Sequence, residues 1–371
     1  MNKVKVVTVL GTRPEIIRLS VIIKKFDNFF DHTLVHTGQN YDYTLNEIFF
    51  EELNIRKPDF FLEVVGQDLG ETMGNVLSKS YKLFDELKPD ALLVLGDTNS
   101  ALCTISAKRL KIPIFHMEAG NRCFDQNVPE ELNRKIADHT SDINLTYTEN
   151  SRRYLLAEGF RKDHVFCVGS PLKEVLDFYS DKIGISLILE KLKLNKDKYI
   201  VASIHREENL DIGENFKSII DALNKAVDLY DTKLIFSTHP RTKKKIDQLN
   251  LKVNRRISFV EPLGFCDYVF LQKNALITLS DSGTISEEST MLGFKAISIR
   301  TSTERPEAID HGNIILSGIT AQNIINSIDI TLGQKGIHNP PLEYLKNDNS
   351  NTVVKIIQSY VPIVNKETWR K

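Results

Sequence analysis

The stretch VKVVTVLGTRPEIIR, residues 4–18, decides the fold class. Its first part, Val4–Leu10, is a mostly apolar and β-branched run, which is typical of a strand buried on both faces of a sheet. Gly11 permits a tight turn, and the spacing of Ile16 and Leu19 then predicts a helix. A strand that leads through a glycine turn into a helix is the first half of a βαβ unit, so a parallel sheet is expected.

The alternation of strand and helix continues along the chain. Further strand-like runs are Thr33–Thr37, Ala91–Leu95, Ile112–His116, Ile143–Tyr147 and Val165–Val168. After a charged stretch that ends at Lys191–Lys198, they resume at Tyr199–Ile204, Lys233–Ser237, Ile257–Val260, Ala275–Leu279, Ala296–Ile299 and Asn313–Leu316. We therefore expect an α/β protein of two Rossmann-like, doubly wound domains that face a cleft, residues 1–171 and 172–350. Ligands of such sheets bind beyond the carboxyl ends of the strands.

Composition excludes several classes of protein. A chain of 371 residues is long enough for two domains, and its formal charge of −1, without basic runs, argues against nucleic acid as a partner. The four cysteines are scattered with no CxxC spacing, which argues against a disulfide framework or structural zinc. No stretch approaches the roughly 18 consecutive apolar residues of a membrane span, and the first apolar run is too short for a signal peptide. We expect a soluble, cytoplasmic protein without membrane insertion.

Polar clusters follow the predicted strands of the first half. In Gly11–Glu15 the start of a helix offers free N–H groups to an anion, and Arg13 and Arg18 add donors suited to phosphate. A plain strand-to-helix turn with a surface arginine is the alternative. In Gly96–Ser100, Asp97 is a candidate acid, although aspartate and serine are also common helix caps.

Two further clusters carry carboxylates. His116–Gly120 ends a predicted buried strand, where the carboxylate of Glu118 is costly unless it is paired, and this favours a functional role. Pro129–Arg134 has the residues of a helix start. Glu130 and Arg134 are spaced i,i+4, so an ordinary helical ion pair explains this segment when it is taken alone.

The second half repeats the pattern. Ser203–Asn209 places His205 at a strand end, and His239 follows the next strand, where a simple turn is the alternative. Asp281–Glu288 resembles a glycine-containing helix start that holds a pyrophosphate, with Glu288 able to bind a ribose diol. A capping box is the alternative there. Arg300–Glu307 combines two arginines with acids at a strand end, which suggests phosphate recognition.

Together these clusters resemble the non-hydrolysing UDP-N-acetylglucosamine 2-epimerases. The family motifs GTRPE, TGQ, GD, HxEAG, PEExNR, HRxEN, DSGxxxEE and TERPE all occur here in order, over nearly the whole chain. The resemblance implies a glycosyltransferase-B type fold with a UDP-sugar in the cleft. It also implies a C-terminal helix, about residues 351–371, that returns to the first domain, and a homodimer. No metal or other cofactor is implied, and the chain has no GxGxxG, Walker A or HExxH motif.

The resemblance further implies an elimination mechanism, in which a base removes the C2 proton while UDP leaves C1, and UDP then adds back. The order of the carboxylates in this mechanism stays open. The positions that match catalytic residues of the family are Asp97, Glu118, Glu130, Arg134 and His205. The candidate UDP-sugar ligands are Arg13, Arg18, His239, Phe265, Ser282, Gly283, Thr284, Glu288 and Arg305.

Three departures from the commonest members point to one branch. TGQ is followed by Asn-Tyr-Asp-Tyr, the segment Asn121–Val128 is shortened, and DSGG is replaced by DSGT. These variants resemble the UDP-N-acetyl-L-fucosamine synthases of capsule and O-antigen pathways, which epimerise C2 of UDP-2-acetamido-2,6-dideoxy-L-talose. The aromatic side chains of Tyr41, Tyr43 and Phe124 would suit the methyl group of a 6-deoxy sugar, although they could also pack a loop. The altered TGQ region puts activation by a second UDP-sugar in doubt.

Three alternative functions remain. The first is a 2-epimerase that interconverts UDP-GlcNAc and UDP-ManNAc. The second is a glycosyltransferase on the same fold, which release of a glycosylated acceptor would reveal. The third is a UDP-sugar sensor that binds without turnover, which deuterium uptake at C2 would exclude. Several carboxylates and a histidine at one site favour proton chemistry.

Overall fold

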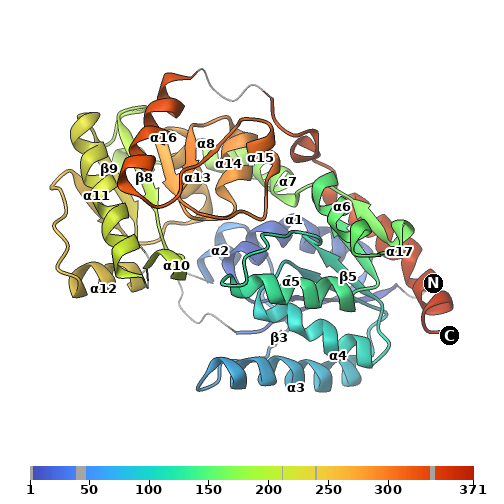
Figure 1. Cartoon of the computed structure of the whole chain (residues 1–371). Coiled ribbons are helices and arrows are strands. Elements are labelled where there is room, and N and C mark those ends of the chain that lie inside the picture. The colour runs from blue at the N-terminus through green and yellow to red at the C-terminus, as the bar shows by residue number, and fades with distance from the viewer. Residues whose placement is uncertain (1–2, 39–46, 211, 239, 335–338) are drawn as a thin grey trace. The chain divides into compact units, whose positions relative to one another are not determined.

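The computed structural model describes residues 3–38, 47–210, 212–238, 240–334 and 339–371. The chain divides into two compact units, each built on its own parallel sheet (Figure 1). Unit 1 consists of Met1–Phe178 and Leu342–Lys371, and unit 2 of Tyr179–Pro341. The predicted class, two α/β domains with parallel sheets, is therefore confirmed.

Unit 1 has a seven-stranded sheet in the order β3-β2-β1-β4-β5-β6-β7, and all neighbours pair in parallel. From β1 the sheet extends in both directions, through β2 and β3 on one side and through β4 to β7 on the other, which is typical of a doubly wound sheet. The strands are β1 (Lys5–Leu10), β2 (Asp31–His36), β3 (Phe60–Phe61), β4 (Ala91–Leu95), β5 (Ile114–Met117), β6 (Ile143–Thr146) and β7 (Val165–Cys167). The short edge strand β3 was not predicted, because two exposed phenylalanines form no run that sequence can recognise.

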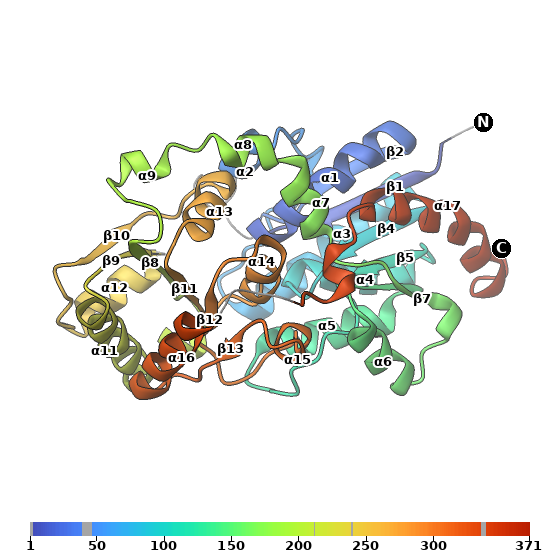
Figure 2. The same ribbon diagram turned by 90° about the horizontal axis from the view of Figure 1, so that it is seen from above.

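Two groups of helices accompany this sheet. One group consists of mutually contacting helices: α1 (Arg13–Phe29), α7 (Pro171–Phe178) and α17 (Asn349–Glu367). Figure 2 shows α17, in dark red, beside α1. The other group is α3 (Leu69–Leu87), α4 (Cys103–Arg109) and α5 (Pro129–Thr140). The remaining elements are α2 (Glu47–Glu52), α6 (Glu149–Ala157) and the 3₁₀ turns η2 (Asn99–Leu102), η3 (Lys162–His164) and η4 (Leu342–Leu345).

The core of unit 1 explains why its strands read as continuous apolar runs. Val7 and Val9 of β1 pack in one buried cluster with Val76 and Phe84 of α3. Every residue of β4 is buried, so both of its faces are covered. Two-sided coverage is the usual state of a parallel sheet, and it removes the alternation that a half-exposed strand would show.

Unit 2 has a six-stranded parallel sheet in the order β10-β9-β8-β11-β12-β13. Its strands are β8 (Tyr199–Ser203), β9 (Lys233–Ser237), β10 (Ile257–Val260), β11 (Ile277–Ser280), β12 (Ala296–Ser298) and β13 (Ile315–Leu316). Its helices are α8 (Ser180–Gly184), α9 (Ile188–Lys191), α10 (Glu207–Leu210), α11 (Gly213–Leu229), α12 (Pro240–Gln248), α13 (Phe265–Lys273), α14 (Ile285–Leu292), α15 (Glu307–Asp310) and α16 (Ala321–Gly333).

Two apolar clusters cover the unit 2 sheet. The larger one joins strand residues such as Ile200 to Phe216 of α11 and Ile324 of α16. The smaller one joins Tyr199 and other strand residues to Leu271 of α13. Alternate residues of β8 thus enter different clusters, as successive side chains of a strand must.

The boundaries of the units differ from the predicted positions at residues 171/172 and about 351. Helix α7 stays with unit 1 because it packs against α1 and α17. The return to unit 1 begins at Leu342, because Tyr344 is buried and Lys346 donates a hydrogen bond to the carbonyl of Cys167 at 3.0 Å. Both contacts join segments far apart in the chain, and no local pattern announces them.

Candidate functional site

The carboxyl edge of the unit 1 sheet gathers six of the predicted site residues. Asp97 follows β4, and Glu118 follows β5, its neighbour in the sheet. A Cβ at Gly96 would lie 3.9 Å from a carboxylate oxygen of Glu118, so that carboxylate lies beside the residue that precedes Asp97. Glu118 has a left-handed backbone (φ 64°). Such a conformation is strained for a residue with a Cβ, and it is found most often at functional sites.

Glu118 is held by an arginine from α1. The Nη1 of Arg18 lies 2.8 Å from Oε2 of Glu118, and both side chains are at most 10% exposed. The guanidinium of Arg18 also lies 5.3 Å from the ring centre of Tyr147. A buried carboxylate needs such a partner, since an unpaired one costs several kcal/mol.

Asp97 is held by an arginine from α5. Nε and Nη2 of Arg134 lie 3.0 and 2.6 Å from Oδ2 of Asp97. Nη1 of the same guanidinium lies 2.9 Å from Glu131. The Asp97 side chain keeps 21% of its surface exposed, so it stays accessible to a ligand while its charge is balanced.

Glu131 was not predicted as a site residue, although it lies in the quoted PEE motif. It accepts hydrogen bonds from the backbone N–H groups of Cys123 and Phe124 at 3.1 and 3.3 Å. Burial opposes its ionisation, but the hydrogen bonds from Cys123 and the charge of Arg134 lower its pKa. Glu131 therefore joins the shortened segment Asn121–Val128 to the guanidinium that holds Asp97.

Glu130 and Arg13 occupy the same edge at helix starts. Glu130 is half-buried in the first turn of α5. Arg13 is the first residue of α1, and its guanidinium lies 5.9 Å from the ring centre of Phe49. Acidic groups at the start of α5 and basic groups at the start of α1 thus follow the carboxyl ends of the unit 1 strands, as the sequence predicts.

Glu15, the last residue of the GTRPE motif, was not predicted as a site residue. Its Oε2 accepts hydrogen bonds from the N–H groups of Gly11 and Thr12 at 3.0 and 2.7 Å, and from the hydroxyl of Thr12. Its Oε1 is bound by the hydroxyl of Thr98, next to Asp97, at 3.1 Å. Burial raises the pKa of Glu15 to about 7. Glu15 therefore ties the first turn to the loop that carries Asp97.

Thr98, and neither Asp97 nor Ser100, caps the short helix that follows β4. Its hydroxyl accepts the N–H of Ser100 at 3.2 Å. The capping explanation for Asp97 was therefore wrong, and its carboxylate is bound to Arg134 instead.

The carboxyl edge of the unit 2 sheet is organised by Asp281, the first residue of the DSG motif, which was not predicted as a site residue. Asp281 is fully buried and accepts the N–H groups of His205 and Arg206 at 3.1 and 2.9 Å. It also accepts a hydrogen bond from Asn209 at 3.0 Å. His205 Nδ1 lies 3.3 Å from Asp281, and the His205 side chain is 39% exposed. The HRxEN segment is thus held in place while His205 faces solvent.

Hydroxyl groups line the start of α14. The hydroxyls of Ser282 and Thr284 lie 3.0 Å apart, and that of Thr284 donates to Glu288 at 2.7 Å. Gln272 of α13 donates to the other oxygen of Glu288 at 2.9 Å. Thr284 is the N-cap of α14 but makes no side-chain cap bond, so the capping-box explanation for this segment was wrong.

Gly283 is surrounded by charged side chains. A Cβ at this position would lie 2.4 Å from an oxygen of Glu304 and 3.4 Å from Nη1 of Arg305. Glu304 is bound to Arg300 at 2.9 Å, and Arg305 to Glu287 at 3.1 Å. These four side chains are buried, and a residue with a Cβ at this position would collide with the carboxylate of Glu304.

The other predicted residues are less informative. Phe265 begins α13 after the N-cap Gly264, and it is buried. His239, Tyr41 and Tyr43 lie outside the described residues. Phe124 is 65% exposed with a left-handed backbone (φ 56°), and its ring packs edge-on against Tyr154 at 5.5 Å.

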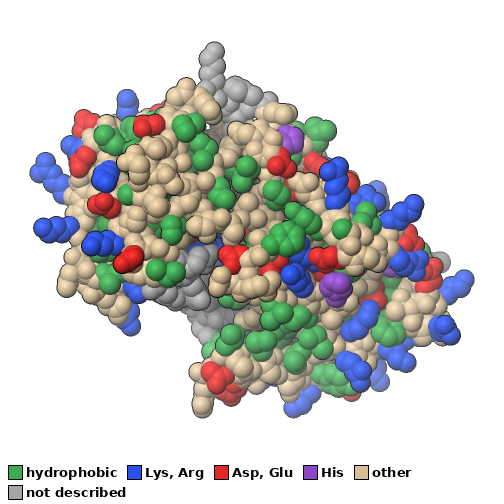
Figure 3. All heavy atoms as spheres, viewed as in Figure 1, with side chains coloured by type: hydrophobic (Ala, Val, Ile, Leu, Met, Phe, Trp, Pro, Cys, Tyr) green, Lys and Arg blue, Asp and Glu red, His purple; other side chains and the backbone are tan. Residues whose placement is uncertain are grey.

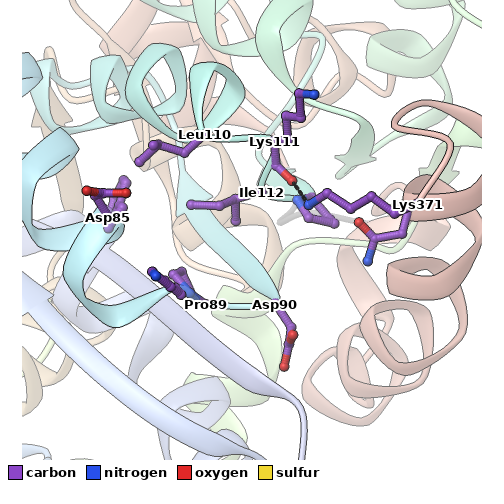
Figure 4. Close-up of a pocket in the computed structure, with 11 residues that line it drawn as sticks. Asp85, Pro89, Asp90, Leu110, Lys111, Ile112 and Lys371 are labelled. Carbon is purple, nitrogen blue, oxygen red and sulfur yellow. Dashed lines mark hydrogen bonds between the residues drawn. The ribbon is translucent and has the colours of Figure 1, made fainter.

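Acidic and basic side chains are interspersed on the face in Figure 3. A cavity of about 350 Å³ lies at the opposite edge of the unit 1 sheet, where Asp90 and Pro113 precede β4 and β5. Lys371 reaches across to the carbonyl of Lys111 at 2.9 Å (Figure 4). The cavity contains none of the predicted site residues. Over the described residues, no helix is long and apolar enough to cross a membrane.

The two edges suit different chemistry. Carboxyl groups held by arginines can take up a proton when ionised and release one when protonated, in a fixed position. A glycine turn with hydroxyls, an exposed histidine and arginines nearby can bind a phosphate-bearing ligand. Unit 1 therefore has the groups for proton transfer, and unit 2 those for binding an anion.

Comparison with known proteins identifies the family of the chain. The model of the family described as UDP-N-acetylglucosamine 2-epimerase matches residues 24–358. The structure of UDP-N-acetylglucosamine 2-epimerase from Rickettsia bellii is 44% identical over the full length of both chains, with a TM-score of 0.93. The structure of the Methanocaldococcus jannaschii UDP-GlcNAc 2-epimerase in complex with UDP-GlcNAc and UDP is 35% identical, with 95% and 99% of the chains covered and a TM-score of 0.90.

A third relative carries another name. The Pseudomonas aeruginosa UDP-2,3-diacetamido-2,3-dideoxy-D-glucuronate 2-epimerase is 32% identical over 335 residues, 89% of this chain and 93% of its own. The relatives thus share epimerisation at C2 in their names and differ in the sugar named. The chain belongs to the non-hydrolysing UDP-N-acetylglucosamine 2-epimerase family, whose members are isomerases.

Proposed function

We propose that this enzyme inverts C2 of UDP-2-acetamido-2,6-dideoxy-L-talose to give UDP-N-acetyl-L-fucosamine. The observation that carries the chemistry is the pair of arginine-held carboxylates, Asp97 with Arg134 and Glu118 with Arg18, at neighbouring strand ends. The choice of the L-sugar rests on the sequences of the segment Asn121–Val128 and of the residues after TGQ.

The C2 proton of an amino sugar is not adjacent to a carbonyl group, so simple deprotonation is too difficult. In the proposed elimination, a carboxylate takes the C2 proton, the C1–O bond breaks with its electron pair going to UDP, and a C1=C2 double bond forms. UDP then adds back at C1 while an acid delivers a proton to the opposite face of C2. Asp97, Glu118 and Glu130 are the proposed acids and bases, and Arg134 keeps Asp97 in position.

The leaving diphosphate needs strong electrostatic capture. We assign this to Arg13 and Arg18 at the start of α1 and to Ser282, Gly283, Thr284 and Arg305 in unit 2. Glu288, held by Thr284 and Gln272, is the proposed partner of the ribose hydroxyls. His205 is the proposed additional catalytic group, with Phe265 and His239 as further ligands.

The sequences of two segments support the choice of sugar. Glu131 fixes the shortened segment Asn121–Val128 through the N–H groups of Cys123 and Phe124. This segment and the altered residues after TGQ distinguish the chain from the commonest family members. A site lined with apolar groups favours a 6-deoxy sugar, because a site built for a hydroxyl leaves buried polar groups unpaired when the hydroxyl is missing.

The test is a side-by-side assay with UDP-2-acetamido-2,6-dideoxy-L-talose and UDP-GlcNAc in D₂O, followed by proton NMR. We expect deuterium at C2 of the product and a preference for the L-sugar of at least ~10²-fold in kcat/KM, about 2.7 kcal/mol. Equal or faster conversion of UDP-GlcNAc would contradict the proposed substrate. Turnover without deuterium at C2 would contradict the elimination mechanism.

The elimination mechanism makes a second prediction about cofactors. The proposed acids and bases are side chains of this chain, so activity should persist after exhaustive dialysis against EDTA and without added NAD. A strict requirement for either addition would contradict the mechanism. The homodimer and the cytoplasmic location stay predictions, and size-exclusion chromatography with light scattering tests the first.

A further inference from the structure

A buried histidine lies between the two loops that carry the unit 1 carboxylates. His116 is the third residue of β5, two positions before Glu118, and its side chain is fully buried. Its Nδ1 lies 2.9 Å from Oδ1 of Asp138 on α5. Its Nε2 lies 2.8 Å from the carbonyl oxygen of Gly96, the residue before Asp97. The imidazole therefore joins α5 to the backbone of the Asp97 loop.

Asp138 joins the same network to the Glu118 loop. It is fully buried, and it accepts the N–H of Gly120, two residues after Glu118, at 3.1 and 3.2 Å. It is also bound by Nη1 of Arg122 at 2.7 Å. A Cβ at Gly120 would lie 2.4 Å from the carbonyl oxygen of Ser151, so only glycine fits this close approach. Asp138 thus fixes the backbone that follows Glu118.

These contacts determine the protons on the imidazole. The Gly96 carbonyl can only accept, so Nε2 carries a proton. Asp138 accepts hydrogen bonds from Arg122 and from the N–H of Gly120 through both of its oxygens, so it faces His116 as an acceptor. Nδ1 must then donate as well, and His116 is an imidazolium. Burial opposes this charge, but the hydrogen bond and charge of Asp138, the Gly96 carbonyl and the charge of Asp97 raise the pKa of His116.

Charged groups of both signs surround the network. The charged groups around the imidazole are Asp138 from α5, Arg122 from the segment after β5, and Asp97 from the loop after β4. Arg122 is bound in turn to Glu158 through two hydrogen bonds of 2.7 Å. The neighbouring residue of β6, Asn144, is uncharged and donates to the carbonyl of Asp138. The positive charge of His116 therefore faces Asp97 across a single peptide group.

We propose that His116 and Asp138 are a positioning pair for the epimerisation, in which the imidazolium fixes the Asp97 loop through the Gly96 carbonyl and favours the ionised form of Asp97. The role in turnover rests on the proposed function, whereas the ionisation state of the pair does not. Neither residue touches the sugar in this proposal. Each acts through the carboxylates at the two strand ends.

The substitution Asp138→Asn separates charge from shape. Its oxygen can still accept from Arg122 and Gly120, while its NH₂ group donates to Nδ1 and leaves a neutral imidazole whose Nε2 still binds Gly96. We expect kcat to fall by at least ~10-fold with KM changed by less than ~3-fold, since an interaction that acts mainly on the chemical step is lost. We expect the acid limb of the kcat–pH profile to move to higher pH, because a carboxylate loses a neighbouring positive charge.

The chain offers a matched control in the same unit. His32 and Asp27 form a second histidine–aspartate pair at 2.6 Å, with the His32 side chain 1% exposed. The Nε2 of His32 binds the hydroxyl of Thr8 within the sheet, away from the strand ends. Asp27→Asn should leave kcat and its pH profile unchanged. Wild-type kcat and an unmoved acid limb in Asp138→Asn, or equal shifts in both variants, would overturn the proposal.

A spectroscopic measurement covers the case in which Asp138→Asn fails to fold. In the wild-type protein labelled with ¹⁵N-histidine, His116, assigned by the loss of its signals in His116→Gln, should show two protonated ring nitrogens at pH 7 and above. A single ring proton at pH 7 would overturn the pair whatever the substrate is. If neither UDP-sugar is turned over, the proposed function fails while this measurement still decides the state of His116.

Discussion

At the carboxyl edge of the unit 1 sheet, Asp97 and Glu118 are each bound to a single arginine side chain, and Asp97 keeps part of its surface exposed. At the same edge of unit 2, Asp281 is fully buried and binds the backbone of the HRxEN segment instead. The acids Glu287 and Glu304 are likewise buried against arginines. The clearest contrast is between Asp97, which stays partly exposed beside an arginine, and Asp281, which is fully buried against backbone N–H groups.

This difference suggests a division of labour. A carboxylate that remains accessible beside a guanidinium can exchange a proton with a ligand. A buried carboxylate whose oxygens accept hydrogen bonds from backbone N–H groups instead fixes the conformation of a loop. In unit 2 the groups left facing outward are hydroxyls, a glycine turn and His205. Substitutions of the unit 1 carboxylates should therefore act on kcat, and substitutions at the glycine turn of unit 2 on the binding of UDP.

The largest effect is expected for Glu118→Gln. Glutamine keeps the shape and can still bind Arg18, but it can neither take up nor deliver the C2 proton. We expect kcat to fall by at least ~10²-fold with the UDP dissociation constant unchanged, the scale of a lost acid or base. Asp97→Asn and Glu130→Gln should behave alike. Steady-state assays and calorimetric titration with UDP measure the two quantities.

The control for this prediction is Glu86→Gln on the exposed side of α3, which should have wild-type kinetics. Near-normal turnover in Glu118→Gln would remove this residue from the chemistry. A loss that appears only in UDP affinity would erase the proposed difference between the units.

A smaller effect, on UDP binding and not on kcat, is expected for Gly283→Ala. The new methyl group would lie 2.4 Å from Glu304, whose carboxylate is held by Arg300, so the turn or the ion pair must move. We expect KM and the UDP dissociation constant to rise by about 10-fold, one such interaction being worth roughly 1.4 kcal/mol, with kcat within ~3-fold of wild type.

Gly213→Ala provides the matched control, because a Cβ there meets nothing within 4 Å in the same unit. It should bind UDP as the wild type does. If Gly283→Ala lowered kcat and left UDP binding intact, the binding role of this edge would be wrong.

The sequence predicted the sheets well because their signal is local. The run Ala91–Leu95 became a strand with the same bounds, since burial on both faces requires continuous apolar residues. Lys233–Ser237 and Ile257–Val260 also became strands with the predicted bounds. Motif order then identified the family, and the quoted motifs follow the strand ends as expected. The edge strand β3 and the limits of the two units were missed, because they depend on contacts between distant segments.

The partners of the site residues could not be predicted in the same way. Helical spacing offered Glu130 as a partner of Arg134, but it could not show that Arg134 also binds Asp97, 37 positions earlier in the chain. Asp138 lies outside every motif, although it contacts His116 and Gly120. A local pattern gives the type of side chain at a strand end, but the ion pair it forms depends on how helices return to the sheet.

The smallest expected effect concerns stability and Glu15. Burial raises its pKa to about 7 from an ordinary value of 4.5, so its contribution to stability is fully present below pH 4.5 and is lost as the pH rises through about 7. Glu15→Gln keeps an oxygen for the N–H groups of Gly11 and Thr12 and places its NH₂ group toward Thr98, but it does not ionise. We therefore expect the melting temperature of this variant relative to wild type to increase by a few degrees between pH 5 and pH 8, on the order of 1–3 kcal/mol.

Glu71→Gln changes the third residue of α3, where the carboxylate is exposed, and should show no such trend in the same scans. A parallel pH dependence of the wild type and Glu15→Gln would mean that Glu15 is ionised throughout this range and is held by the turn as an anion.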